Sequence, residues 1–229
     1  MADFTLEKEN YHKNYYMIGV DEAGRGSWAG PIVATACWLD YKKHELLSDN
    51  INDSKKINSN NRKKIILSLN DSIKFSSSVS TAKEIDHYGL TLANFMAMKR
   101  ALWCLCESVN KELRVSYLNT KIYIDGKQTP NFSNVDVANQ NLKKINLRLH
   151  STTSLVKGDN KSKTIALASI IAKETRDSIM KNYSISYPNY KFDNHFGYGT
   201  KKHSEAIEKF GISPIHRKSF KPISPYIVN

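Results

Sequence analysis

The chain alternates short apolar runs with longer segments in which apolar residues recur every three or four positions. Residues 15–20 and 32–39 are apolar and rich in β-favouring side chains, and three glycines lie between them. This pattern predicts a strand, a glycine turn and a second strand that pairs back as an antiparallel hairpin. Residues 73–80, 121–125 and 152–156 are further strand candidates, and the short apolar central runs fit a sheet that is covered on both faces.

Two segments have the composition of helices that pack on such a sheet. Between residues 92 and 109, apolar side chains recur at three- and four-residue steps, and residues 163–180 are rich in Ala and Ile with few helix breakers. From residue 183 the composition shifts to Tyr, Pro, Gly, Lys and His, with a short helical pattern over 201–210 that ends at Gly211. We therefore expect an α/β protein with a mixed central sheet and flanking helices. Residues 1–182 would form the main domain, and residues 183–229 a small helical extension packed on it.

Composition points to a folded, basic protein. The 229 residues include 34 Lys and Arg against 22 Asp and Glu, a formal net charge of +12. Such a charge attracts polyanions, and nucleic acid is the leading one. A hydrophobic fraction of 40% excludes a disordered basic tail. Three cysteines cannot all pair, and no stretch approaches the roughly 20 apolar residues of a membrane span, so we expect reduced thiols and a cytoplasmic protein without membrane contact.

Four acidic residues stand at or just after predicted strand ends: Asp21, Glu22, Asp125 and Asp159. If the three strands run in the same direction in one sheet, their carboxyl ends gather these acids in one crevice. Carboxylates without Cys or His neighbours favour Mg²⁺ or Mn²⁺, and two such ions can drive phosphodiester hydrolysis. Taken singly, each acid is better explained as a turn former or a helix N-cap.

Asp21 and Glu22 are adjacent in sequence, which makes it difficult for both side chains to reach one site. Adjacent residues of a regular strand point to opposite faces, so Asp21 and Glu22 share a site only if the pleat breaks or the longer Glu side chain reaches around. Gly24, Arg25 and Gly26 follow directly and make a break plausible. They do not form a dinucleotide-binding fingerprint, because the third glycine is missing and a strand follows. Glycines here would let a ligand approach backbone N–H and C=O groups closely, although an ordinary turn explains the spacing equally well.

These residues resemble a known family. Residues 18–36, IGVDEAGRGSWAGPIVATA, resemble the signature of bacterial type 2 ribonuclease H, ribonuclease HII. In the same order follow DSKK at 53–56, IDG at 124–126, KGDNKSKTIALASIIAKETRD at 157–177, GYGT at 197–200 with His203, and HR at 216–217 with SF at 219–220. Each short motif is weak alone, but the ordered set covers most of residues 17–220 and is specific.

The resemblance implies an RNase H-like fold and a metal-dependent endoribonuclease. It implies hydrolysis of the RNA strand of RNA–DNA hybrids and cleavage 5′ of a single ribonucleotide embedded in duplex DNA, which leaves 3′-hydroxyl and 5′-phosphate ends. The metal-binding and catalytic acids would be the four already selected, with Mn²⁺ or Mg²⁺ as cofactor. Gly24, Arg25 and Gly26 would contact the ribonucleotide 2′-hydroxyl through backbone groups, Tyr198 would stack on the sugar of the next deoxynucleotide, and Lys55 would meet a phosphate.

Several positions depart from the family or have other expected roles. Phe196 stands where the family commonly has Lys, and Gly89 where it usually has Asn. Asp177 lies more than four helical turns beyond Asp159, which favours an internal salt bridge or a peripheral role over a fifth metal ligand. The resemblance assigns His203, His216 and Arg217 to structure or to phosphate contacts.

We expect a monomer that acts on RNA–DNA hybrids and on DNA containing ribonucleotides. A sliding clamp is possible as a partner but is not indicated, because residues 221–229 contain no clear clamp-binding motif. Two other interpretations stay open on the residues alone: a basic protein that binds hybrids without cutting them, and an RNase H-fold nuclease that acts on DNA. Metal-dependent cleavage separates the first of these from the enzyme, and cutting that is insensitive to replacing the ribonucleotide by a deoxyribonucleotide would favour the second.

Overall fold

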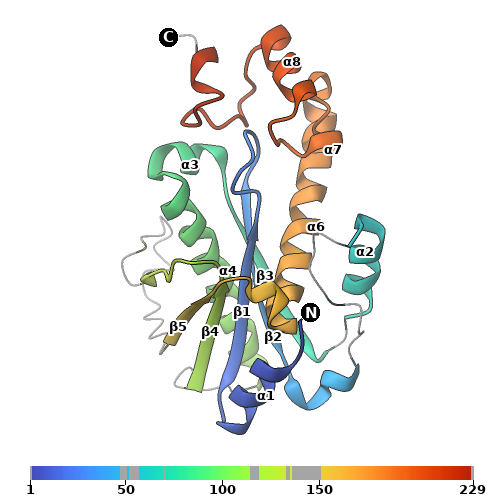
Figure 1. Ribbon diagram of the computed structural model, residues 1–229, viewed down its shortest axis with the longest axis vertical. Helices are drawn as coiled ribbons and strands as arrows, with labels where there is room; N and C mark the ends of the chain where they lie inside the picture. The colour runs from blue at the N-terminus through green and yellow to red at the C-terminus, as the bar shows by residue number, and fades with distance from the viewer. Residues whose placement is uncertain are drawn as a thin grey trace.

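A five-stranded mixed sheet forms the centre of the protein (Figure 1). The computed structural model describes residues 2–46, 51, 57–69, 71–113, 119–132, 135 and 151–227. The strands are β1 (Tyr16–Ala23), β2 (Ile32–Leu39), β3 (Ile73–Ser80), β4 (Thr120–Asp125) and β5 (Ser151–Leu155), in the order β3-β2-β1-β4-β5. β1 and β2 pair antiparallel, as do β2 and β3, whereas β4 lies parallel to both β1 and β5. The predicted hairpin is therefore confirmed, and the carboxyl ends of β1, β4 and β5 lie at one edge of the sheet.

Two long helices cover the two faces of the sheet. On one face α4 (Leu90–Leu113) packs Met96, Leu102 and Leu105 against strand residues such as Val20 and Ile124. On the other face α6 (Lys163–Ser186) packs Ala and Ile side chains against the opposite residues of β2 and β3. β2 is buried at every position, which agrees with the prediction of a doubly covered sheet.

Smaller helices surround the sheet. They are α1 (Thr5–His12), η1 (Tyr41–Leu46), α2 (Ser59–Leu67), α3 (Ala82–Tyr88) and η4 (Gly158–Asn160). α3 begins with a capping box, in which the Thr81 side chain accepts a hydrogen bond from the Glu84 N–H and the Glu84 side chain accepts one from the Thr81 N–H. None of the described helices is long and apolar enough to cross a membrane.

The C-terminal residues gather at the far end of α6, beside the connection between β1 and β2 (Figure 1). They form η5 (Pro188–Tyr190), α7 (Phe192–His195), α8 (Lys201–Phe210) and η6 (Ser224–Tyr226). α8 has the predicted bounds, and Gly211 ends it with a φ of 72°, a value that favours glycine. Met180, Phe192 and Ile207 are at the centre of an aromatic-rich cluster that also includes Trp28 from the β1–β2 connection. Residues 28 and 29 belong to this cluster, and Gly197 and Gly199 lie against its members Met180 and Trp28.

Candidate active site

β1 carries Asp21 and Glu22 toward opposite faces of the sheet. Pairing with β2 continues without interruption through Asp21, Glu22 and Ala23, so the predicted strand end at residue 20 and the possible break in the pleat are both wrong. Asp21 faces α6, where Ser169 forms a hydrogen bond with its carboxylate. Glu22 faces the α4 side and lines a cavity of about 360 Å³ that also includes Arg25, Asn94 and Asp125. The longer Glu side chain must therefore reach around the edge to share a site.

Asp125 ends β4 beside Asp21. The parallel register pairs Val20 with Ile124, so the next residues on the two strands, Asp21 and Asp125, fall on the same face of the sheet. One carboxylate oxygen of Asp125 accepts a hydrogen bond of 2.6 Å from the Gly158 N–H. That contact joins the end of β4 to the loop after β5.

Asp159 lies in η4, immediately after Gly158, and is 5% exposed. Its carboxylate accepts a hydrogen bond of 3.1 Å from the Asn160 side chain. Lys157 precedes η4 in a left-handed conformation, and this turn brings residues 158 and 159 back over the end of β4. Gly158, the residue before Asp159, is thus hydrogen-bonded to Asp125. This proximity agrees with the prediction that both acids lie at the same edge of the sheet.

The electrostatics of Asp21 show that the acids act on one another. Burial raises the pKa of Asp21 well above its usual value, and the negative charges of Glu22 and Asp125 raise it further. Divalent cations would relieve this repulsion, and the oxygen-only donors are those that Mg²⁺ and Mn²⁺ prefer. The residues present therefore fit such ions. In the described part of the chain, no three Asp, Glu, His or Cys side chains are grouped as a complete metal site, so the joint ligand role of the four acids stays a prediction.

The glycine turn, residues 24–26, projects beyond the acidic pair. Arg25 and Gly26 are exposed, whereas Gly24 is buried with a φ of 93° that favours glycine. A Cβ on Gly24 would lie 2.0 Å from Nε of Arg176, so the absence of a side chain is required there. The turn therefore combines an exposed backbone with a tightly packed base, which suits close approach by a ligand.

Tyr198 belongs to a segment that is bound to the residues just after this turn. The Trp28 N–H donates to the Gly197 carbonyl at 2.8 Å, and the Ala29 N–H donates to the same oxygen at 3.2 Å. The Tyr198 ring is 39% exposed. The residue before Tyr198 is therefore bound to residues 28 and 29, which follow the glycine turn, whereas Lys55 falls outside the described residues.

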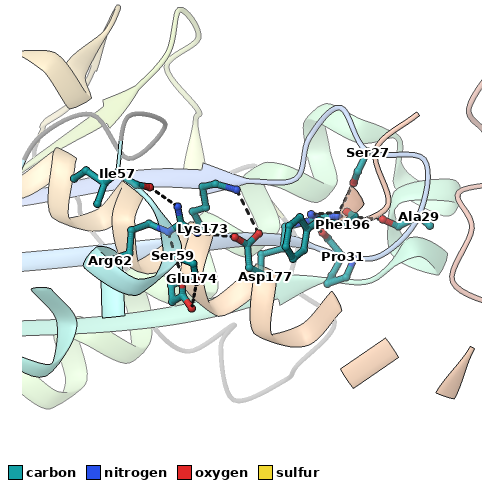
Figure 2. A network of polar contacts seen from close by, with 11 residues as sticks. Ser27, Ala29, Pro31, Ile57, Ser59, Arg62, Lys173, Glu174, Asp177 and Phe196 are labelled. Atoms are coloured by element: carbon teal, nitrogen blue, oxygen red, sulfur yellow. Dashed lines mark hydrogen bonds and ion pairs between the residues drawn. The ribbon is translucent and has the colours of Figure 1, made fainter. Parts of the chain in front are cut away.

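Other charged residues have structural partners. Asp177 accepts a hydrogen bond of 2.7 Å from Arg62 and lies 3.3 Å from the Lys173 ammonium, which confirms the predicted internal salt bridge. Arg62 also binds Glu174 at 3.2 Å and so attaches α2 to α6 (Figure 2). Arg217 is buried and donates to backbone carbonyls, which supports the structural alternative for this residue.

The sequence interpretation missed two residues of this region. Asn94 is 2% exposed and lines the cavity beside Glu22. A buried amide within an apolar helical pattern was the signal that could have indicated it. Arg176 also lies under the glycine turn, but the Arg-Asp pair in which it stands looks like a solvent-exposed helix surface, so nothing in the local pattern distinguishes it.

Comparison with known proteins identifies the family. The family model described as ribonuclease HII matches residues 18–223. Ribonuclease HII of Fusobacterium nucleatum is 44% identical over 222 residues, which cover 95% of this chain and 88% of that protein. Ribonuclease HII of Clostridioides difficile is 41% identical over 217 residues, which cover 94% of this chain and 74% of that protein.

Solved structures agree in fold. The crystal structure of ribonuclease H2 from Pyrococcus horikoshii matches with a TM-score of 0.63 and 26% identity, over 92% of this chain and 96% of that chain. Bst ribonuclease HIII in complex with Mn²⁺ matches with a TM-score of 0.67 at 18% identity, over 94% of this chain and 70% of that chain, which concerns the fold alone. The RNase H-like fold expected from the motifs is thus confirmed. The chain belongs to the ribonuclease HII family and is a type 2 ribonuclease H, an endoribonuclease.

Proposed function

We propose that this endoribonuclease hydrolyses the RNA strand of RNA–DNA hybrids and cuts 5′ of a single ribonucleotide embedded in duplex DNA, leaving 3′-hydroxyl and 5′-phosphate ends. The proposal rests on one observation: three features lie close together in the structure. Carboxylates that repel one another lie at the strand edge, the exposed glycine turn follows them directly, and Arg176 lies against both the base of that turn and the Tyr198 ring. The first feature suits metal-dependent hydrolysis of a phosphodiester, and the other two suit recognition of a ribose followed by a deoxyribose.

Each group has a defined task. Asp21, Glu22 and Asp125 would hold one divalent cation, and Asp159 would help to hold a second and to place the attacking water. When bound, two such ions activate a water and neutralise charge on the leaving oxygen. The backbone of residues 24–26 would hydrogen-bond the 2′-hydroxyl, which distinguishes RNA from DNA. Tyr198 would stack on the following sugar, and Lys55 would attract a phosphate.

The identity of the metal, Mn²⁺ or Mg²⁺, belongs to this proposal as well. Both ions take oxygen ligands, and the described donors at this edge are oxygens. Titration of apo protein with each ion, followed by cleavage rates at saturating concentration, decides between them.

We also propose that the enzyme works as a monomer whose residues 183–229 form an extension of the catalytic domain, residues 1–182. The cluster around Phe192 and Ile207, which includes Met180 of α6, supports this arrangement. Analytical ultracentrifugation with and without a hybrid duplex tests the monomer. The same experiment with a bacterial sliding clamp tests that partner, and co-sedimentation would add it to the proposal.

The deciding experiment uses three duplexes of one sequence: all DNA, DNA with one ribonucleotide, and an RNA–DNA hybrid. Wild-type protein is expected to cut the second and third in the presence of Mn²⁺ or Mg²⁺ and to stop when chelator is added. Asp125→Asn should abolish cutting. Asp40→Asn is the matched control, because Asp40 follows β2 at the opposite edge of the sheet and also accepts a backbone hydrogen bond, from Lys42. Equal cutting of the all-DNA duplex would refute the proposal in favour of a DNA nuclease, and binding without cutting would refute it in favour of a hybrid-binding protein.

A further inference from the structure

Two arginines are buried beneath the connection between β1 and β2. Arg176 of α6 is 1% exposed and Arg217 is 0% exposed. Among the described residues, neither makes a salt bridge with a carboxylate. Buried charges are costly unless they are paired or fully hydrogen-bonded, so such residues have a specific task.

The guanidinium of Arg176 binds two segments that are far apart in sequence. Its Nε donates to the Pro31 carbonyl at 2.9 Å, and its Nη2 donates to the Ser27 hydroxyl at 2.7 Å and to the Ala29 carbonyl at 3.1 Å. Its Nη1 donates to the Phe196 carbonyl at 2.9 Å. Figure 2 shows these four acceptors gathered at one place. One planar group therefore joins the connection after the glycine turn to the segment that leads into Tyr198.

Arg176 also contacts Tyr198 and Gly24, two of the residues proposed to recognise the substrate. The Arg176 guanidinium carbon lies 5.4 Å from the centre of the Tyr198 ring, within the range of a cation–π interaction. On its other side, Arg176 occupies the space that a Cβ on Gly24 would fill. The side chain thus touches both the base of the glycine turn and the tyrosine.

Arg217 completes the base of the turn from the C-terminal side. It donates to the carbonyls of Gly24 at 2.7 Å, Arg25 at 2.8 Å and Gly30 at 3.0 Å. These bonds fix the orientation of the peptide groups in the turn, whereas Arg176 contacts both the turn and the Tyr198 ring.

We infer that Arg176 is a positioning residue that sets the glycine turn and Tyr198 at a fixed relative position, so that the two recognise a ribonucleotide and the deoxynucleotide after it as one unit. The inference rests on the proposed function. A lysine would keep the positive charge but cannot reproduce the fork, because its donors radiate from a single nitrogen. The position therefore requires the shape of arginine as well as its charge.

A double-mutant cycle tests this coupling. The values of kcat and KM are measured on the one-ribonucleotide duplex for wild type, Arg176→Lys, Tyr198→Ala and the double variant. Groups in contact are coupled by amounts that correspond to roughly 2-fold to 150-fold. We expect Arg176→Lys alone to lower kcat/KM by about 30-fold, and to lower it by no more than about 3-fold further once Tyr198 is absent. Equal losses in both backgrounds would overturn the inference, because a merely structural residue would act independently of Tyr198.

Two additions keep the test decisive. Arg100→Lys is the control, since Arg100 is a half-buried arginine that binds the Val79 carbonyl and Glu84 away from the turn. It should leave both parameters within about 2-fold of wild type, as expected for a site without coupling. If Arg176→Lys does not fold, Ser27→Ala removes one acceptor of the same guanidinium and should show the same non-additivity with Tyr198→Ala at a smaller amplitude.

A substrate-free measurement separates this inference from the proposed function. Amide hydrogen exchange should be faster at residues 24–30 and 196–199 in Arg176→Lys, with β4 unchanged; unchanged exchange in both segments would overturn the coupling. Failure of the wild-type protein to cut the one-ribonucleotide duplex would instead refute the proposed function and, with it, the specificity that Arg176 is inferred to support. The two failures are therefore distinguishable.

Discussion

A chain of hydrogen bonds through two buried histidines predicts how the protein responds to acid. The Ser213 N–H donates to Nδ1 of His216 at 2.8 Å, so that nitrogen must be an acceptor. The proton of a neutral His216 is then on Nε2, which donates to Nε2 of His203 at 3.0 Å. This leaves Nδ1 of His203 to donate to the Tyr198 carbonyl at 3.0 Å. Both rings are consequently neutral, and an additional proton would break the chain.

The pKa values of the two histidines determine how much folding stability is lost in acid. Burial lowers the pKa of both His203 and His216 from 6.5 to about 4. Because the folded-state pKa is below the unfolded one, the unfolded chain binds protons first, and stability is lost as the pH falls from about 6.5 toward 4. One such histidine removes about 2 kcal/mol from the free energy of unfolding between pH 7 and pH 5. The rings share a hydrogen bond, so their titrations are coupled and the two contributions do not simply add.

The assay is urea unfolding at pH 7, 6 and 5, followed by circular dichroism. At pH 7, His203→Gln should be less stable than wild type, and the difference should shrink by about 2 kcal/mol at pH 5 because only wild type loses the contribution of this ring. His87→Gln, at an exposed position of α3, should follow the wild-type curve. A constant difference between His203→Gln and wild type at all three pH values would refute the reasoning.

Three further perturbations test the packing and the acids. Gly19→Ala should lower the free energy of unfolding by about 2–3 kcal/mol in urea unfolding, because its Cβ would lie 2.8 Å from the Ile165 backbone nitrogen. Gly24→Ala should destabilise by about 2 kcal/mol, whereas Gly26→Ala, whose Cβ would meet nothing within 4 Å, should change thermal stability by less than about 0.5 kcal/mol. In chelator, Asp21→Asn should raise the melting temperature, because it removes a buried charge that its acidic neighbours repel, and it should also abolish the stabilisation that added Mn²⁺ gives wild type. A lower melting temperature for that variant, or an undiminished response to Mn²⁺, would contradict the electrostatic account.

Much of the sheet could be predicted from the sequence because local and tertiary preferences agree there. The runs that became β2 and β3 have the predicted bounds, and the parallel arrangement of β1, β4 and β5 brings three strand ends to one edge as expected. The end of β1 was placed too early because Asp21 and Glu22 are poor strand formers. Pairing with β2 overrides that preference.

Helix α1 was missed for a different reason. It is polar along most of its length, and its stability depends on Glu7, which is 3% exposed and accepts hydrogen bonds from Ser162 at 2.6 Å and from the Thr164 N–H at 2.9 Å. These partners lie more than 150 residues away in sequence. The Glu7 carboxylate accepts hydrogen bonds from the first turn of α6, and no local sequence pattern indicates such a long-range contact. The sequence alone therefore did not predict α1.

Helix α6 explains how the acidic strand edge and the proposed recognition segments keep a fixed spacing. Ser169 binds Asp21 at the strand edge, Arg176 binds the connection after the glycine turn and the segment before Tyr198, and Met180 packs beneath Gly30. Seven residues separate Ser169 from Arg176, which is about two helical turns and a rise of about 10 Å. A single helix therefore contacts Asp21 through one turn and, about two turns later, the segments proposed to recognise the ribose. Rearrangement of either part would require α6 to bend or to separate from the sheet, and its close packing against Gly19 opposes both.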